Sequence, residues 1–129
     1  MSLQTVHLDL PEEKLVAYRR SALKRQKARL ARIQPRLARA WEVARRAAQL
    51  LREQFQAKRV VVFGSLLHEK CFTEWSDIDI AVWGLSPEQT FRAMGAVMEL
   101  DRAFEINLVD VGACPPSLLA AIEQEGKEL

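Results

Sequence analysis

The stretch from Val60 to Val82 constrains the fold most, because it places two aspartates one residue apart in a pattern that alternates like a β-strand. Asp77 and Asp79 point to one face of such a strand, while Ile78 and Ile80 point to the other. The apolar face predicts a buried sheet, and the paired carboxylates predict a cation between them. Mg²⁺ suits this pair, because it prefers hard oxygen ligands and is usually shared between carboxylates and the phosphates of a substrate.

A second strand and a tight turn are predicted just before this segment. Residues 59–63 read RVVVF, a short buried strand, and lead directly into Gly64 and Ser65. Glycine allows the backbone to approach a ligand closely, and a helix opening at Ser65 would direct N–H groups and a positive dipole end at an anion. Together with the aspartates, the turn predicts a site for a metal-bound nucleoside triphosphate.

The spacing of these residues resembles a known family. Gly64-Ser65, followed after ten residues by Ser76-Asp77-Ile78-Asp79, is similar to the signature of the minimal nucleotidyltransferases, small members of the DNA polymerase beta superfamily. The resemblance covers residues 58–129. It implies two Mg²⁺ ions as cofactors and a nucleoside triphosphate, ATP in first place, as the donor of a nucleoside monophosphate to a protein or nucleic-acid hydroxyl.

The same resemblance implies roles for individual residues. Metal binding falls to the two aspartates, and nucleotide binding to the Gly-Ser turn and to nearby side chains. The implied metal ligands are Asp77 and Asp79, and the implied nucleotide contacts are Gly64, Ser65, Ser76 and Lys70, with His68 as a further phosphate partner.

The chain departs from the family pattern on a later strand, residues 104–110. By alignment with the family, a third catalytic carboxylate belongs at Asn107. An asparagine oxygen ligates a metal, but it carries no negative charge and accepts no proton from the attacking hydroxyl. Glu105, two residues earlier on the same face, is the alternative third acid. We therefore include Asp77, Asp79, Glu105 and Asn107 among the candidate catalytic residues.

The resemblance also implies a partner. Minimal nucleotidyltransferases often work beside a helical HEPN protein as toxin–antitoxin pairs, and this chain lacks the Arg and His motif of HEPN ribonucleases, so it would be the antitoxin. Two other classes stay open: a catalytically impaired module of the same fold that masks a partner protein, and a helical self-association protein whose sheet is only structural.

Charge divides the chain into two halves. The net charge of the 129 residues is +2, but residues 1–59 carry a balance of +10 and residues 60–129 a balance of −8. We expect a basic amphipathic helical extension over residues 1–57 and the nucleotidyltransferase domain over residues 58–129. The basic face admits a nucleic-acid partner or a solvated surface that balances the acidic half.

The extension begins with a strand-like piece from Thr5 to Leu10 and a helix start at Pro11. An apolar stripe at helical spacing continues through Pro35, where the helix should break or kink near Gln34. Two arrangements follow: a helical hairpin that turns near Pro35 and covers the sheet, or a kinked helix that pairs with another chain. The second leads to a homo-oligomer through the N-terminal helices.

The remaining elements complete a small α/β fold, a mixed sheet with helices packed on it. Ser86 caps a helix that should run to about Asp101. It is expected to bury Phe91, Met94, Val97, Met98 and Leu100.

A final helix opens at Pro115-Pro116-Ser117 and stops at Gly126. Trp75 and Trp83 flank the aspartates, either as base-stacking residues or as part of the cleft wall and core. No apolar run reaches membrane-spanning length, and the two cysteines are far apart, which favours a soluble cytoplasmic protein.

Overall fold

A computed structural model of the chain describes residues 11–129. The expected strand from Thr5 to Leu10 lies outside these residues. Contacts divide the chain into two compact units, one ending at Gln34 and the other spanning Pro35–Leu129. Within residues 11–129, no helix combines the length and apolar character that a membrane crossing requires.

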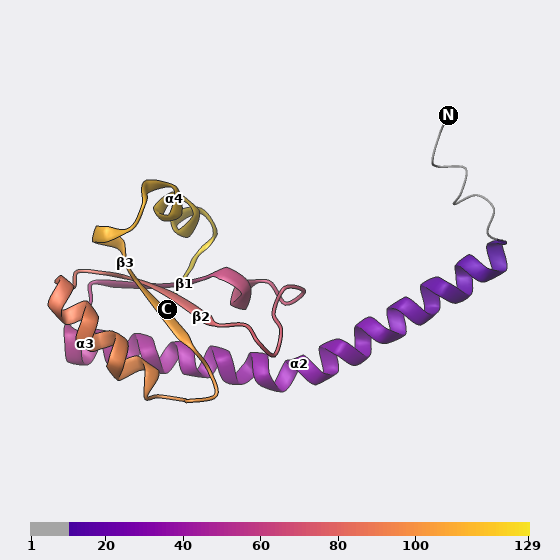
Figure 1. Cartoon of the computed structure of the whole chain (residues 1–129), viewed down its shortest axis with the longest axis horizontal. Helices are drawn as coiled ribbons and strands as arrows, with labels where there is room; N and C mark the ends of the chain where they lie inside the picture. Colours follow the sequence, from indigo (N-terminus) through magenta and orange to yellow (C-terminus); the bar gives the residue numbers. More distant parts are fainter. Residues whose placement is uncertain (1–10) are drawn as a thin grey trace. The chain divides into compact units, whose positions relative to one another are not determined.

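The first helix of the described residues, α2, runs from Glu12 to Phe55 and therefore has residues in both units (Figure 1). Its first turn contains Glu12 and Glu13, as the predicted start requires. The chain remains helical through Pro35, so a break near Gln34 is wrong and no turn forms a helical hairpin there, while a kink stays a prediction. Proline costs about 3 kcal/mol in a helix interior relative to alanine. Burial of the α2 face from Leu37 to Leu51 stabilises the helix despite this cost.

The sheet is mixed, as predicted, and residues 11–129 contribute four strands to it in the order β3-β2-β1-β4. Strand β1, Arg59–Phe63, pairs antiparallel with both β2, Ile78–Trp83, and β4, Lys127–Glu128. Strand β3, Ile106–Asp110, pairs parallel with β2. The sequence did not indicate β4, because a strand of two charged residues has no apolar alternation.

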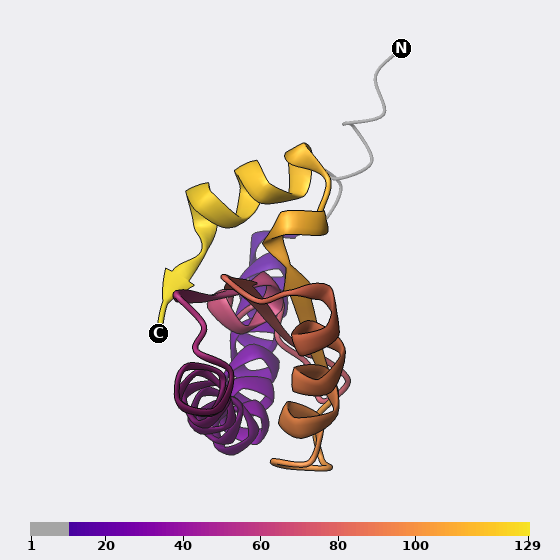
Figure 2. The same ribbon diagram turned by 90° about the vertical axis from the view of Figure 1, so that its left-hand side faces the viewer.

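Helices cover both faces of the sheet in the second unit (Figures 1 and 2). The second-unit part of α2 lies with α3, Pro87–Met98, on one face, and α4, Pro116–Glu125, lies on the other. This part of α2 covers the sheet, as one of the two predicted arrangements has it, but as part of one continuous helix and not of a hairpin. Its buried side chains are Leu37, Ala40, Val43, Ala44, Ala47, Ala48 and Leu51.

Strand alternation distributes the apolar residues between the two faces. Val61 and Ala81, opposite each other on β1 and β2, form a core cluster with Val111 and with Ile122 of α4. The residues between them on the strands point to the other face and are fully buried: Val60, Val62, Ile78, Ile80 and Val82. The sheet is thus apolar on both faces, and polar residues occur at the ends of its strands.

Helix α3 begins as predicted but exposes a different face. Ser86 and Gln89 form a capping box, in which each side chain accepts a hydrogen bond from the other residue's backbone N–H. The helix ends at Met98 rather than near Asp101.

The predicted burial of three large side chains of α3 was wrong: Phe91 is 79% exposed, Met94 38% and Met98 47%. Thr90, Ala93 and Val97 lie against the sheet instead, and Leu100 beyond the helix is half-buried. The buried face of α3 thus consists of Thr90, Ala93 and Val97, and its largest side chains point outward.

Gly126 ends α4 for a reason other than the predicted one. Its φ of −69° is accessible to any residue, so it is not a left-handed cap. A Cβ atom there would lie 2.3 Å from Cγ1 of Val61 and 2.5 Å from the carbonyl oxygen of Ile122. The glycine is needed because the chain passes close to β1 on its way into β4.

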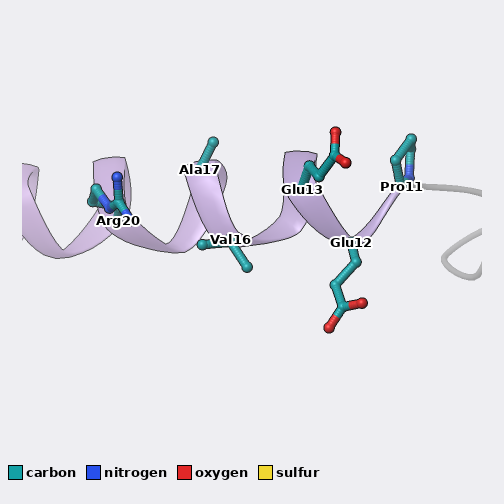
Figure 3. A pocket seen from close by; sticks show the side chains of 6 residues that line it. All are labelled: Pro11, Glu12, Glu13, Val16, Ala17 and Arg20. Atoms are coloured by element: carbon teal, nitrogen blue, oxygen red, sulfur yellow. The ribbon is translucent and has the colours of Figure 1, made fainter.

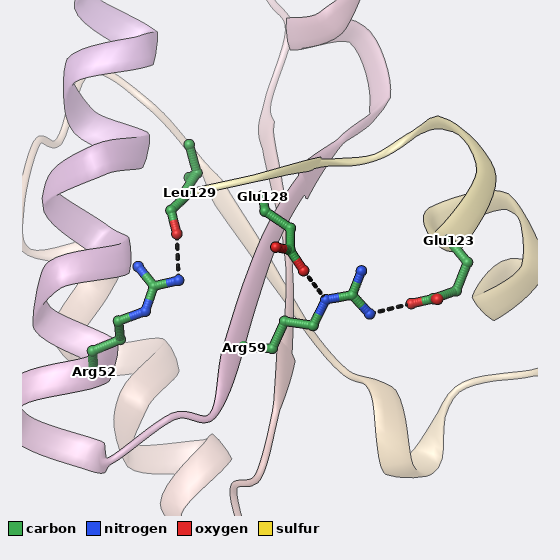
Figure 4. A network of polar contacts seen from close by, with 5 residues as sticks. All are labelled: Arg52, Arg59, Glu123, Glu128 and Leu129. Atoms are coloured by element: carbon green, nitrogen blue, oxygen red, sulfur yellow. Dashed lines mark hydrogen bonds and ion pairs between the residues drawn. The ribbon is translucent and has the colours of Figure 1, made fainter.

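Charged side chains hold the C-terminal segment in place (Figure 4). The guanidinium of Arg59 donates to carboxylates of Glu123 and Glu128 and stacks over the ring of Trp83, 4.4 Å from its centroid. Arg52 of α2 donates to the carbonyl oxygen of Leu129. Trp83 therefore belongs to this packed region, which favours a structural role for it over stacking on a base.

Candidate nucleotide and metal site

Strands β2 and β3 bring the two aspartates and the asparagine together. Asp77 directly precedes β2, and the parallel register places Asp79 opposite Asn107. The side-chain Nδ2 of Asn107 donates to Oδ1 of Asp79 at 3.0 Å and to Oδ2 of Asp77 at 3.3 Å. An asparagine amide thus bridges the carboxylates at the place where the alignment expected a third acid.

Gly64 closes the site from the side of β1. It follows the strand directly and has a φ of +80°, in the left-handed region that favours glycine. A Cβ atom at this position would lie 2.3 Å from Oδ2 of Asp79. Backbone and carboxylate therefore occupy adjoining space, and only glycine permits both.

The position of Asp79 alters its acidity. Burial raises the pKa of the Asp79 carboxyl above its ordinary value of 3.8, and the nearby charge of Asp77 raises it further. The hydrogen bond from Asn107 lowers the pKa and partly offsets these effects. A cation beside the pair would remove the cost of keeping both carboxylates ionised.

The loop before Asp77 is held by a local turn. The backbone N–H of Thr73 donates to Oγ of Ser76 at 2.8 Å, and the N–H of Ser76 donates to the carbonyl oxygen of Thr73. The N–H of Trp75 donates to Oγ1 of Thr73, while the Trp75 side chain is 84% exposed. Trp75 is therefore not a core residue. Thr73 is a structural contributor that our sequence reasoning missed, although its Thr-x-x-Ser spacing is a turn signal.

The segment after Gly64 is shorter than predicted. A helix opening at Ser65 was expected, and the structure has a single 3₁₀ turn, η1, over Gly64–Leu67. Ser65 is half-buried within it, whereas His68 and Lys70 are exposed in the loop that follows. Their predicted contacts with a nucleotide stay predictions.

Glu105 lies just before β3 and is exposed. Its backbone carbonyl accepts a hydrogen bond from the N–H of Ile78 at 2.9 Å, which aligns β3 with β2. Within residues 11–129, no three His, Cys, Asp or Glu side chains converge in an arrangement that could hold a metal ion. The oxygen ligands that the site itself offers are two carboxylates and one amide.

A pocket at the start of α2 does not offer a comparable group of ligands. It is lined by Pro11, Glu12, Glu13, Val16, Ala17 and Arg20, all from one end of a single helix (Figure 3). Figure 3 shows the Glu12 and Glu13 side chains pointing to opposite sides of the helix, so they form no joint cation site.

Comparison with known families gives one match, to the family described as "Polymerase beta, Nucleotidyltransferase", over residues 46–129. A search of curated protein sequences finds no significant match.

Solved structures share the fold at low identity. A chain in the crystal structure of a toxin–antitoxin with AMP-PNP is 22% identical, with a TM-score of 0.57, covering 66% of this chain and 70% of that one. A chain in the complex of tri-AMPylated Shewanella oneidensis HEPN toxin with MNT antitoxin is 22% identical, with a TM-score of 0.53, covering 69% and 70%. A mutant of the toxin–antitoxin MntA-HpeT is 24% identical, with a TM-score of 0.53, covering 66% and 68%.

Proposed function

Because this chain belongs to the polymerase beta nucleotidyltransferase family, we propose that it binds a nucleoside triphosphate with Mg²⁺ and transfers a nucleoside monophosphate to a hydroxyl group. The observation that carries the proposal is the grouping of Asp77, Asp79 and Asn107 beside Gly64. Residues from three separate segments converge there on one small polar site.

The site has ligands of the kind that Mg²⁺ prefers. Hard oxygen ligands are available from the carboxylates of Asp77 and Asp79. Asn107 adds a third oxygen if its side-chain amide rotates so that the oxygen, and not Nδ2, faces the metal ion. When bound, Mg²⁺ would neutralise charge on the triphosphate and orient it for in-line displacement. Gly64 and Ser65 hold the terminal phosphates in this scheme, with Ser76 and Lys70 as further nucleotide contacts.

The proposed reaction breaks a phosphoanhydride bond of the triphosphate and forms a phosphodiester bond to the acceptor. The acceptor oxygen forms a bond to the α-phosphorus, and the bond from that phosphorus to the bridging oxygen of pyrophosphate breaks. The hydroxyl proton passes to solvent or to a carboxylate, for which Glu105 is the candidate in this chain. The neutral amide of Asn107 is not a base and cannot accept this proton.

The structural neighbours support a choice of nucleotide and partner. One was solved with AMP-PNP, and another is a HEPN toxin carrying AMP in complex with an MNT antitoxin. We therefore propose ATP as the nucleotide and a HEPN-type helical protein as the acceptor or binding partner, with this chain as the antitoxin. The site lies within residues 58–129, which we propose as the catalytic domain.

A second candidate follows from Asn107. A site that lacks the third carboxylate has lost a group that prepares the attacking hydroxyl, so the chain would bind nucleotide and mask its partner without transferring AMP. Nucleotide binding is common to both candidates, and group transfer separates them.

Transfer of labelled ATP tests the proposal. The chain is incubated with Mg²⁺ and α-labelled ATP, with and without a HEPN-type partner, and compared with an Asp77→Asn, Asp79→Asn double variant. A Glu88→Gln, Glu125→Gln variant removes two exposed charges elsewhere as a matched control. We expect label on the partner with wild type and the control, and loss of the label with the double variant.

Unlabelled partner under all conditions, together with nucleotide binding by wild type, would favour the masking module. No nucleotide binding at all would reject both candidates.

A further inference from the structure

The bridging amide of Asn107 has a consequence for how the site balances its charge. Two carboxylates at close range normally repel each other unless a cation lies between them. Here Nδ2 of Asn107 offers its two N–H groups, one toward Asp77 and one toward Asp79, at 3.3 and 3.0 Å. The amide takes the position that a cation would otherwise fill, so the two aspartates are held together before any metal binds.

Asn107 also limits the negative charge that the site provides for binding metal ions. The two-ion arrangement of nucleotidyl transfer clamps the attacking and the leaving oxygens with separate metal ions, which share carboxylates between them. This site has two carboxylates and one neutral side chain, and within residues 11–129 no third acidic, His or Cys side chain joins them. Two negative charges balance a single divalent ion. A second ion would have to rely on the substrate and on a neutral oxygen.

We propose that Asn107 makes this a preformed site for one divalent ion, in place of the two-ion site that the family resemblance implies. The inference depends on the proposed function, since it assumes that Asp77 and Asp79 receive a metal-bound nucleotide. Asn107 is a positioning residue in the metal-free protein and supplies a neutral ligand in the loaded one. The chain then binds its nucleotide with one ion and lacks the second ion that would activate the acceptor hydroxyl.

Counting bound metal ions tests this proposal directly. Mn²⁺, which replaces Mg²⁺ and is visible by electron paramagnetic resonance, is titrated into the full chain saturated with AMP-PNP. The Asp77→Asn, Asp79→Asn variant gives the background from surface sites and from free Mn²⁺–nucleotide. We expect one ion per chain above background for wild type, two for Asn107→Asp and one for Asn107→Ala.

Thermal unfolding in chelator gives a second readout that needs neither nucleotide nor activity. Asn107→Asp adds a third carboxylate and removes the bridge, so its Tm falls below that of wild type and recovers when Mn²⁺ is added. Wild type changes less on the same addition. Asn107→Ala removes the bridge without adding charge, and its Tm lies between the other two in chelator.

Each outcome decides between the inference and its premise. Two ions bound by wild type would overturn the role of Asn107 while leaving the proposed function intact. If Glu105→Gln then reduced that number to one, Glu105 would be the missing third acid. If Asn107→Asp did not bind a second ion, the proposed role of Asn107 would likewise be overturned. Absence of any metal-dependent AMP-PNP binding would reject the proposed function itself.

Discussion

At the scale of single residues, the site depends on contacts between residues that are far apart in the sequence. Asp79 is flanked by the backbone of Gly64 and by the amide of Asn107. The glycine makes room for one carboxylate oxygen, and the asparagine binds the other. A change at either neighbour therefore acts on Asp79, even where the carboxylate itself is unchanged.

Gly64→Ala should damage both stability and metal binding. The added Cβ would meet Oδ2 of Asp79 at 2.3 Å, and alanine is strained at a φ of +80°. We expect a loss of about 1–3 kcal/mol in the free energy of unfolding, with weaker binding of Mn²⁺ and AMP-PNP. Urea denaturation and calorimetric titration measure the two effects.

Gly95→Ala is the matched control. Gly95 lies within α3, and a Cβ there would have no neighbour within 4 Å. Alanine at this position should stabilise the protein by about 0.5–1 kcal/mol and leave metal binding unchanged. Equal effects of the two substitutions would show that the crowding at Asp79 has no consequence.

Asp79→Asn should stabilise the metal-free protein at neutral pH. Burial, and then the charge of Asp77, raise the pKa of Asp79, so the folded state holds this proton more tightly than the unfolded state does. Wild-type stability from this group is therefore present below the ordinary value of 3.8 and is lost as pH rises through the raised folded pKa. The asparagine avoids that loss and still accepts the hydrogen bond from Asn107.

The measurement is the difference in Tm between Asp79→Asn and wild type in chelator, from neutral pH down toward the ordinary carboxyl value of 3.8. We expect a positive difference at neutral pH that shrinks as the buffer is acidified toward the ordinary carboxyl value. Glu125→Gln, an exposed change on α4, should show no such trend. A variant less stable than wild type at neutral pH would contradict the argument.

The residues that meet at the site were predictable from the sequence, but their contacts were not. Alternation along a strand placed Asp77 and Asp79 on one face, and alignment placed Asn107 near them. The hydrogen bonds depend on the register of β2 against β3, which is set by packing between segments 28 and 30 residues apart. The hydrophobic pattern of a strand fixes which face each side chain points to, but it does not say which residue of a distant strand lies opposite.

At the scale of elements, prediction succeeded where a segment has its own start signal or alternation. The strands at residues 59–63 and 78–83 and the helices that follow Ser86 and Pro115 lie where the pattern indicated. Prediction failed where packing against other helices or strands decides which residues are buried or paired. The buried face of α3 depends on how closely the helix approaches the sheet, and β4 exists because β1 offers it an edge.

Ser86→Ala should destabilise α3 and the connection that it makes between β2 and β3. The serine hydroxyl accepts a hydrogen bond from the backbone N–H of Gln89, at 3.2 Å, and the Gln89 side chain accepts one from the N–H of Ser86. Loss of this cap costs about 1 kcal/mol. The midpoint of urea unfolding should fall while the slope of the transition is kept.

Ser117→Ala is the control for that change. Ser117 lies at the start of α4, where no side chain makes a capping hydrogen bond. Its replacement should change stability by less than about 0.5 kcal/mol. A cost at Ser117 as large as that at Ser86 would show that helix propensity or solvation, and not the cap, explains the effect.

At the scale of the whole molecule, charge and packing follow different divisions of the chain. The described part of the first unit, residues 11–34, carries eight Lys or Arg against two Glu and exposes Val16, Tyr18 and Leu23. The second unit contains the sheet, its helices and every residue of the proposed site. Sequence patterning indicated a boundary near residue 57, whereas contacts divide the chain at Gln34, because residues 35–55 of α2 contribute to the core.

This division predicts how fragments of the chain behave. A fragment of residues 35–129 retains the second unit and should unfold cooperatively and bind Mn²⁺ and AMP-PNP as the full chain does. A fragment of residues 58–129 keeps the strands but removes Ala40, Val43 and Leu51, which are at most 1% exposed. Large-to-small changes at single core positions cost about 2–5 kcal/mol each. Loss of the whole helix face exceeds the total stability of an ordinary domain, about 5–15 kcal/mol.

We therefore expect the shorter fragment to lack a cooperative transition by circular dichroism and to bind no nucleotide. Adding residues 35–57 as a separate peptide should restore part of the signal, because the helix then has its sheet to pack on. A fragment of residues 58–129 that unfolds at the same urea midpoint as the full chain would show that the sheet is stable without α2. In that case the buried alanines and leucines of the helix would need another explanation.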